Sequence, residues 1–311
     1  MSNSTNYLGL LAVLAILIAF FGFATDHFFA ARTFRTIANQ LPSLVVVSVG
    51  MTFVLAIAGI DLSVGSVLAF GGAVMGVLLV DFGFPLWLCI GAALLAGLCC
   101  GWLAGFVSIQ WSVPSFIVTL GLLEVARGGT YLVTGSQTKY IGAAVAGIGD
   151  PLGLIGLSPA FLIALLITIA GQIALTRTVF GRYVLSIGGN KEAARLAGVN
   201  INKVQIAVFA LAGLLSGLGG IFQTAYLQSA DPNAGAGMEL AAIAAVVIGG
   251  TSLMGGRASV INSFIGVLII AVLQSGLAQL GTSDPAKRVI TGIVIVVAVV
   301  IDMYRQRKQK R

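Results

Sequence analysis

The sequence contains few charged residues. Only 9% of its 311 residues are Asp, Glu, Lys or Arg, whereas 58% are hydrophobic and the mean hydropathy is +1.06. A soluble globular domain carries roughly 25% charged residues, so this chain has too little polar side chain to cover a surface in water. The composition excludes a soluble enzyme, a disordered tail and a secreted disulfide scaffold, and it predicts a polytopic membrane protein.

Histidine and cysteine are also scarce. His27 is the one histidine, in a short polar connection, and Cys89, Cys99 and Cys100 lie in one apolar stretch. We expect buried thiols without disulfides, no metal site, and no Ser/His/Asp or Cys/His set for catalysis, which argues against a membrane enzyme. The sequence contains no Gly-Lys pair, so the chain lacks a nucleotide-binding P-loop.

Long apolar runs are abundant. At roughly 20 residues per membrane-spanning helix, ten spans would use about two-thirds of the chain. The runs lie at 8–24, 42–59, 63–80, 85–107, 114–133, 158–175, 204–225, 239–250, 258–280 and 288–303. The eighth run is too short for a full crossing, so it is tilted, broken or extended by the Gly-rich segment after it. We expect an all-α transmembrane bundle that forms one domain over residues 1–311, and the 41 glycines suit close helix packing in a membrane.

Basic residues predict the orientation, because short cytoplasmic loops carry an excess of Lys and Arg. Ten of the 17 basic residues lie in two segments, after the sixth span and after the last. They are Arg177, Arg182, Lys191, Arg195, Lys203, Arg305, Arg307, Lys308, Lys310 and Arg311. Four predicted crossings separate the two segments, so both termini are predicted to be cytoplasmic. The same count places Asp81, Asp150, Asp231 and Glu239 in outer loops. The net charge of +7 is then a matter of topology, and no nucleic-acid partner is expected.

A carboxylate interrupts two apolar runs in the segment Gly-Ile-Asp-Leu-Ser-Val-Gly-Ser at 59–66. Its glycines favour a break in the helix, and Asp61 or Ser63 would then cap the N–H groups of the helix that follows. The alternative is a polar point on a translocation path, because a carboxylate near lipid must face protein, water or a helix terminus. The candidate residues here are Gly59, Asp61, Ser63, Gly65 and Ser66.

The segment Gly-Gly-Thr-Ser-Leu-Met-Gly-Gly-Arg at 249–257 also lies between two apolar runs. We interpret it as a flexible helix break, and Thr251 and Ser252 join the candidates for the translocation path. Both segments carry a pair of glycines six residues apart. This shared spacing is compatible with an inverted internal repeat, in which each segment would belong to one half of the chain.

Glu124 and Arg127 are charged residues inside an apolar run. Three residues apart on a helix, they share one face and are expected to form an ion pair. The alternative is a proton-coupled carrier that uses the carboxylate as a relay.

The longest polar segment, 176–203, contains signals for a short helix. Glu192 to Ala197 are mostly strong helix formers, Asn190 is a plausible N-cap and Gly198 a stop. A helix here, on the cytoplasmic face, would dock into a partner. A merely solvated loop would seldom contain so many helix signals.

Several motifs in the same order resemble the permease subunits of bacterial ABC sugar importers of the ribose permease type, along nearly the whole chain. The motifs lie at 50–54, 59–66, 181–183, 187–190, 194–198 and 239–256. The branched-chain amino acid permeases share the general plan but look less like this chain around Asp61.

This resemblance implies an inner-membrane protein of ten helices that pairs with a second permease subunit as a homodimer. It also implies cytoplasmic ATPase subunits, which would bind the ATP and Mg²⁺, and a periplasmic sugar-binding protein. No cofactor and no ATP hydrolysis are expected on this chain. The docking motif for the ATPase matches Glu192, Ala193, Ala194 and Gly198, with Asn190 and Arg195 beside them, within a coupling loop at 176–203. The Pro that ends the fuller motif is absent.

The substrate is weakly encoded, since the binding protein would do most of the selecting. Ribose is the leading candidate; other pentoses, hexoses, polyols and furanosyl signal molecules stay open. Basic residues of the outer face are expected to pair with carboxylates on the binding protein. They are Arg32, Arg35, Lys139, Lys287 and Arg288. The alternative function is an ion-coupled secondary carrier for a small polar solute that uses Glu124 or Asp61.

Overall fold

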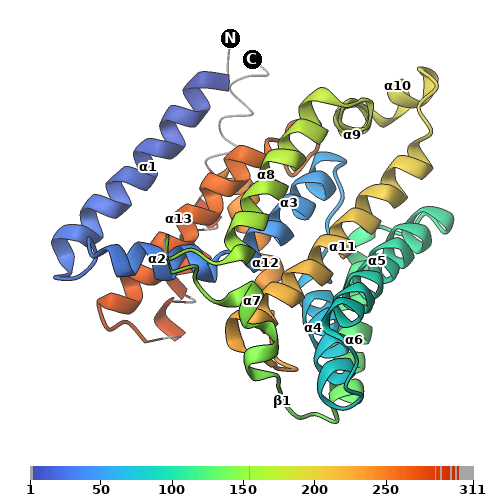
Figure 1. The fold of residues 1–311 in the computed structure, drawn as a ribbon. Coiled ribbons are helices and arrows are strands. Elements are labelled where there is room, and N and C mark those ends of the chain that lie inside the picture. Colours follow the sequence, from blue (N-terminus) through green and yellow to red (C-terminus); the bar gives the residue numbers. More distant parts are fainter. Residues whose placement is uncertain are drawn as a thin grey trace.

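The computed structural model describes residues 3–153, 155–283, 285–287, 289–294, 296–297 and 300. Most of these residues are helical (Figure 1). The helices are α1 (Asn3–Ala24), α2 (Ala31–Gln40), α3 (Pro42–Ala56), α4 (Val64–Val80), α5 (Leu86–Gln110), α6 (Ser115–Thr134), α7 (Ala146–Gly149), α8 (Pro159–Arg177), α9 (Val179–Gly189), α10 (Lys191–Leu196), α11 (Ile201–Leu227), α12 (Met238–Ile248) and α13 (Val260–Gln279). Two short strands, β1 (Lys139–Tyr140) and β2 (Ser229–Ala230), form an antiparallel pair.

The first nine predicted apolar runs each coincide with a helix, namely α1, α3, α4, α5, α6, α8, α11, α12 and α13. The tenth run lies only partly within the described residues, and the basic tail at 304–311 lies outside them. Among the described residues, six helices are long and apolar enough to cross a membrane, and α2 with α3, bent by 50°, would make a seventh. α4 and α12 have only 17 and 11 residues. The all-α membrane class is confirmed, whereas the total of ten spans stays a prediction.

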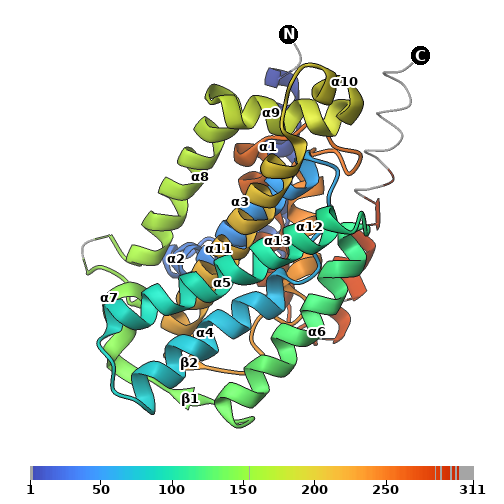
Figure 2. The ribbon, with the colours of Figure 1, turned by 90° about the vertical axis from the view of Figure 1, so that its right-hand side faces the viewer.

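Glycines bring α11 into direct backbone contact with its neighbours. α5 lies beside α11 in both ribbon views (Figures 1 and 2). A Cβ atom on Gly101 of α5 would lie 2.8 Å from the Cα atom of Gly213, and one on Gly97 would lie 2.9 Å from that of Gly217. Further along the same glycine-bearing side of α11, a Cβ on Gly220 would lie 2.9 Å from the backbone nitrogen of Gly72 in α4. Small residues at such contacts are how membrane helices associate without a hydrophobic force between them.

The start of α13 is held by two side chains. Ser259 Oγ accepts a hydrogen bond from Asn262 N at 3.3 Å. Gln172 Oε1 of α8 accepts from Val260 N at 2.8 Å and from Ile261 N at 3.1 Å. Together these oxygens satisfy three of the N–H groups that a helix leaves without a partner at its first turn, and they fix α8 to α13.

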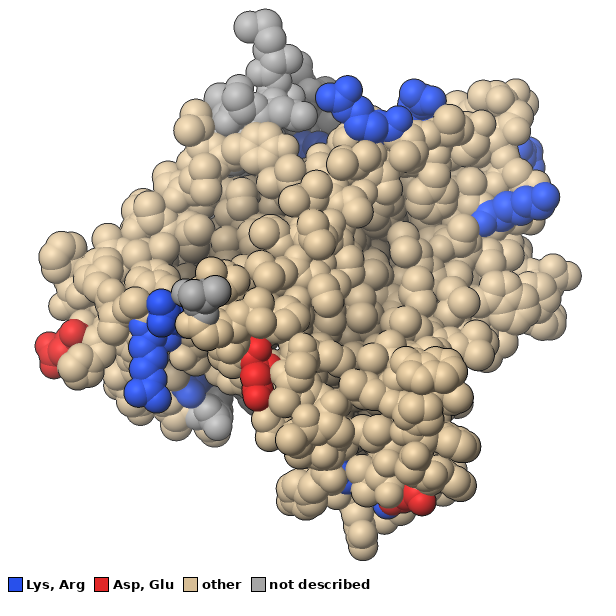
Figure 3. Space-filling view, viewed as in Figure 1, with Lys and Arg blue, Asp and Glu red and all other residues tan. Residues whose placement is uncertain are grey.

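The charged residues are segregated along the molecule. α9, α10 and the start of α1 lie at one end, while β1 and α7 lie at the other (Figure 1). Lys and Arg side chains gather at the α9–α10 end, and a broad band with few charged side chains separates them from the opposite end (Figure 3). At that opposite end, Lys139 Nζ and Asp81 Oδ2 form an ion pair at 2.7 Å. This arrangement agrees with the predicted placement of the N-terminus and the segment at 176–203 on one side.

One detail differs from the sequence predictions. The segment at 176–203 contains a second helix, α9, whose buried face includes Val184 and Ile187 and whose N-cap Thr178 accepts a hydrogen bond from Gly181 N at 3.2 Å.

Cys89 is buried within the protein, whereas Cys99 is exposed on the surface of α5, a helix that is apolar enough to cross a membrane. Burial of all three thiols, by protein or by lipid, stays a prediction. Because Cys99 lies two residues from both Gly97 and Gly101, helical geometry turns it away from α11.

The glycine contact between α5 and α11 predicts a difference between two substitutions on one helix. Gly101→Ala places a methyl group against the backbone of α11, and we expect it to lower the stability of the protein by about 1–3 kcal/mol through overpacking. Gly91→Ala is the matched control, because no described atom lies within 4 Å of a Cβ there. Thermal unfolding of both variants in detergent is the measurement, and equal midpoints would contradict the packing account.

Candidate functional site

Asp61 closes a tight turn in the loop between α3 and α4. The residue is 1% exposed, and its Oδ1 atom accepts hydrogen bonds from Ser63 N at 2.9 Å and from Ser63 Oγ at 2.6 Å. Ser63 is the N-cap of α4, but its side chain makes no capping hydrogen bond. The predicted helix break is confirmed. The prediction that Asp61 or Ser63 caps α4 is wrong in detail, since the carboxylate binds the residue before the first turn.

Two hydroxyl groups at the start of α6 hold the backbone of the same loop. Ser115 Oγ accepts a hydrogen bond from Ile60 N at 3.0 Å, and Thr119 Oγ1 accepts one from Leu62 N at 3.1 Å. Irregular backbone at membrane depth is tolerated where protein surrounds it and satisfies its polar groups. No local spacing in the sequence connects Ser115 and Thr119 with a loop more than 50 residues away, so the sequence does not predict these two contacts.

Gly65 allows α12 to approach the first turn of α4. The position that a Cβ atom of Gly65 would take is occupied by a carboxylate oxygen of Glu239 and the carbonyl oxygen of Gly235. Glu239, which we expected in an outer loop, therefore lies in the first turn of α12 and contacts α4. Glu239 Oε2 and Ser66 Oγ are buried and have no hydrogen-bond partner within the described part of the chain.

The second break, between α12 and α13, meets the first. Gly255 and Gly256 have φ angles of +80° and +76°, which glycine adopts at no steric cost. Gly256 N donates a hydrogen bond of 3.0 Å to the carbonyl oxygen of Ala56, the last residue of α3. The predicted helix break at 249–257 is confirmed. The hydrogen bond between Gly256 and Ala56 shows that the two breaks are in contact, whereas an inverted internal repeat stays a prediction.

The hydroxyl candidates for a translocation path are enclosed by protein in this structure. Ser63 and Ser66 are each 1% exposed, Thr251 is 0% exposed and Ser252 is 5% exposed. Their role in transport stays a prediction.

The predicted short helix on the polar segment is present as α10. Asn190 Oδ1 accepts a hydrogen bond from Ala193 N at 2.9 Å, and Gly198 follows the helix with a φ of +83°. Glu192 and Arg195 form an ion pair at 2.6 Å on its exposed surface, while Ala194 is 4% exposed. The N-cap and the stop are confirmed.

Leu196 is an exposed residue of α10 that the sequence pattern alone does not single out. Its side chain is 81% exposed, on a helix of only six residues. An apolar side chain held out by a short, capped helix is suited to fill a pocket in another protein.

The expected ion pair between Glu124 and Arg127 is absent from the described structure, so that prediction is wrong. Arg127 Nη1 donates hydrogen bonds of 3.0 Å each to the carbonyl oxygens of Pro232 and Ala234, and Glu124 is exposed on α6. The two carbonyl groups belong to the loop before α12, and they satisfy the guanidinium in place of the carboxylate.

The basic residues predicted for the outer face differ in their surroundings. Arg32 lines a pocket of about 440 Å³, and the ion pair with Asp81 already engages Lys139. Arg35 is exposed beside Gly156, Lys287 is half-buried, and Arg288 lies outside the described residues.

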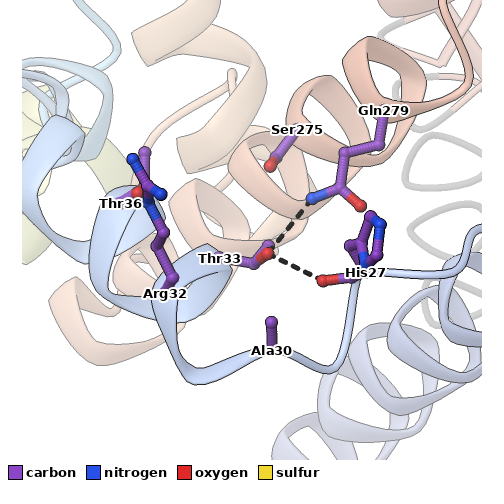
Figure 4. A pocket seen from close by; sticks show the side chains of 7 residues that line it. All are labelled: His27, Ala30, Arg32, Thr33, Thr36, Ser275 and Gln279. Carbon is purple, nitrogen blue, oxygen red and sulfur yellow. Dashed lines mark hydrogen bonds between the residues drawn. The ribbon is translucent and has the colours of Figure 1, made fainter.

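The pocket beside Arg32 is lined by His27, Ala30, Arg32, Thr33, Thr36, Ser275 and Gln279 (Figure 4). Gln279 Nε2 donates to Thr33 Oγ1 at 3.2 Å, which joins α13 to α2 across it.

Comparison with known proteins gives consistent matches along the chain. The family described as branched-chain amino acid transport system / permease component matches residues 33–299. The ribose import permease protein of Haemophilus influenzae is 40% identical over 303 residues, and that of Escherichia coli is 38% identical over the same length, each covering 95% of this chain and 93% of the relative. The fructose import permease protein of Rhizobium meliloti is 33% identical, over 95% of this chain and 84% of its own. No solved structure matches.

The turn at Asp61 predicts how two substitutions differ. Asp61→Asn keeps an oxygen acceptor for both hydrogen bonds from Ser63, so we expect little change in thermal stability. Asp61→Ala leaves two buried donors without an acceptor, which costs roughly 1–3 kcal/mol of stability. Thermal unfolding in detergent checks this, and a loss of stability in Asp61→Asn as large as in Asp61→Ala would show that the negative charge, rather than the hydrogen bonds, matters.

Proposed function

Because the chain belongs to the family of transport-system permease components that includes the ribose and fructose import permeases, we propose that it forms the membrane pathway for ribose in an ATP-driven importer. The chain is a multi-pass permease subunit of a sugar importer in the bacterial inner membrane. The observation that carries the proposal is identity of 38–40% to ribose import permeases over 95% of the chain, against 33% to a fructose import permease.

In the proposed topology the chain crosses the membrane ten times and has both termini in the cytoplasm. The gathering of Lys and Arg at the α9–α10 end supports this orientation. Two copies pair to enclose the pathway. α4, which begins at the first break, and α12, which ends at the second, contribute to it. Gly59, Asp61, Ser63, Gly65, Ser66, Thr251 and Ser252 belong to these breaks.

The proposed partner on the cytoplasmic side is an ATPase subunit that docks on α10. The exposed Leu196 side chain supports this, together with the caps that hold the helix. The other residues of the proposed docking element are those of α10 and its two ends, namely Asn190, Glu192, Ala193, Ala194, Arg195 and Gly198. ATP and Mg²⁺ bind to the partner, so hydrolysis occurs on a separate subunit and this chain transmits its effect to the pathway.

The proposed partner on the outer side is a soluble sugar-binding protein. Arg32 and Arg35 on α2 support this, because both side chains are exposed. Their positive charges are complementary to the carboxylates that such a partner would present. Lys139 contributes less, since Asp81 neutralises it.

Co-purification from native membranes in mild detergent tests the proposed function. We expect an ATPase subunit and a sugar-binding protein in the eluate by mass spectrometry, with ribose retained by the binding protein. In proteoliposomes, the complex should take up ribose only with ATP. A chain that purifies alone after crosslinking, and takes up solute under an ion gradient without ATP, would contradict the proposal in favour of a secondary carrier.

Two truncations on α10 test the docking surface. Leu196→Ala removes the exposed apolar side chain, and we expect ATPase affinity to fall by about tenfold or more, as for a residue at the centre of an interface. Lys191→Ala is the control, because Lys191 is exposed on the same helix. Pull-down of the ATPase subunit at graded concentrations is the measurement, and equal affinities for the two variants would remove Leu196 from the interface.

A further inference from the structure

The end of α9 touches both helix breaks at one point. Gly188 and Gly189 end α9, Ala56 ends α3, and Gly256 lies in the α12–α13 loop. Gly256 N donates its hydrogen bond to Ala56 O directly beside Gly188. We call this set, with Gly255 and Ala58 next to it, the glycine junction.

The three segments of the glycine junction meet backbone to backbone. The position of a Cβ atom on Gly188 is occupied by the carbonyl oxygen of Ala56, and it would lie 2.5 Å from Gly256 N. A Cβ atom on Gly255 would lie 2.9 Å from both Ala58 N and Gly188 Cα. The atoms in contact belong to the backbone of each segment. Rotation of a side chain therefore cannot absorb a movement of one segment against another.

The backbone at the glycine junction is held in an unusual conformation. Ala58 has a φ of +59°, a region in which residues other than glycine are uncommon. Gly255 and Gly256 are also in this region, at +80° and +76°. A non-glycine residue persists there only when its surroundings determine its conformation, and the surroundings of Ala58 include Gly255.

The glycine junction continues directly into α10. Asn190, the N-cap of α10, follows Gly189 in the chain. Phe180, near the start of α9, stacks on Phe53 of α3 with ring centroids 6.0 Å apart. α9 is therefore attached to α3 at both of its ends, and α10 follows it after one residue.

We propose that Gly188 is a positioning residue for transport: it transmits displacement of α10 to the two breaks, at the start of α4 and the end of α12, through the glycine junction. This rests on the proposed function, in which an ATPase moves α10. A shift of Gly188 pushes on Ala56 O and Gly256 N together, because both lie at van der Waals distance from it. The two breaks then move in concert rather than separately.

Adjacent glycines on α9 provide the test. Gly188→Ala forces α9 away from Ala56 and Gly256, whereas Gly189→Ala adds the same methyl group at a position whose nearest neighbour is Gly256 Cα at 4.0 Å. Each variant is reconstituted in proteoliposomes with the ATPase subunit, the binding protein and radiolabelled ribose. The readouts are ATPase retained in the complex, ATP hydrolysed and ribose taken up per ATP.

For Gly188→Ala we expect normal retention of the ATPase and continued hydrolysis, but a fall of about tenfold in ribose taken up per ATP, a magnitude typical of lost coupling between sites. Gly189→Ala should stay within about twofold of the unaltered complex. An unchanged ratio in Gly188→Ala, or an equal fall in both variants, would overturn the role of the glycine junction. Failure of the unaltered complex to take up ribose would instead overturn the proposed function.

A second measurement decides the matter if Gly188→Ala does not assemble. Hydrogen exchange of the unaltered complex is followed with and without a non-hydrolysable ATP analogue. We expect the peptides covering 190–198 and 254–257 to change exchange together, and a peptide around Gly91 of α5 to stay constant. A change at 190–198 with none at 254–257 would overturn the proposal.

Discussion

Direct contact between backbones, permitted by glycine, is the constraint on which the rest of this structure depends. Lipid is as apolar as the helix surfaces, so association in a membrane relies on close van der Waals packing rather than on burial from water. Gly101 against Gly213 lets α5 and α11 touch, and Gly65 admits Glu239 beside α4. At the glycine junction the same device joins three segments that come from distant parts of the chain.

The second requirement is that the broken helices have their polar groups satisfied without water. Hydroxyl groups of α6 accept from the α3–α4 loop, Asp61 binds Ser63, and Gln172 of α8 accepts from the first residues of α13. Each break is thereby held by a helix other than its own. In the proposed function these breaks divide the bundle into short helix segments that move during transport. The neighbours that satisfy the breaks would then set which segments move together.

The sequence predicted features that depend on neighbours in the chain. Apolar runs predicted nine helices, and Asn190 and Gly198 predicted the bounds of α10 within a residue or two. α9 was missed, although Thr178 and the spacing of Val184 and Ile187 indicate an amphipathic helix. What failed depends on distant residues: Arg127 binds carbonyl groups more than 100 positions away, and Glu239 meets α4 across the bundle. Local spacing contains no information on these partners.

In the proposed mechanism, α10 and the two breaks move as one unit. Electron cryomicroscopy of the complete transporter, with and without a bound ATP analogue, tests it most directly. We expect α10, Gly188, Ala56 and Gly256 to keep their mutual contacts in both states and to shift as one body relative to α5 and α11. A structure in which α10 shifts while Ala56 and Gly256 stay fixed against α11 would contradict the account.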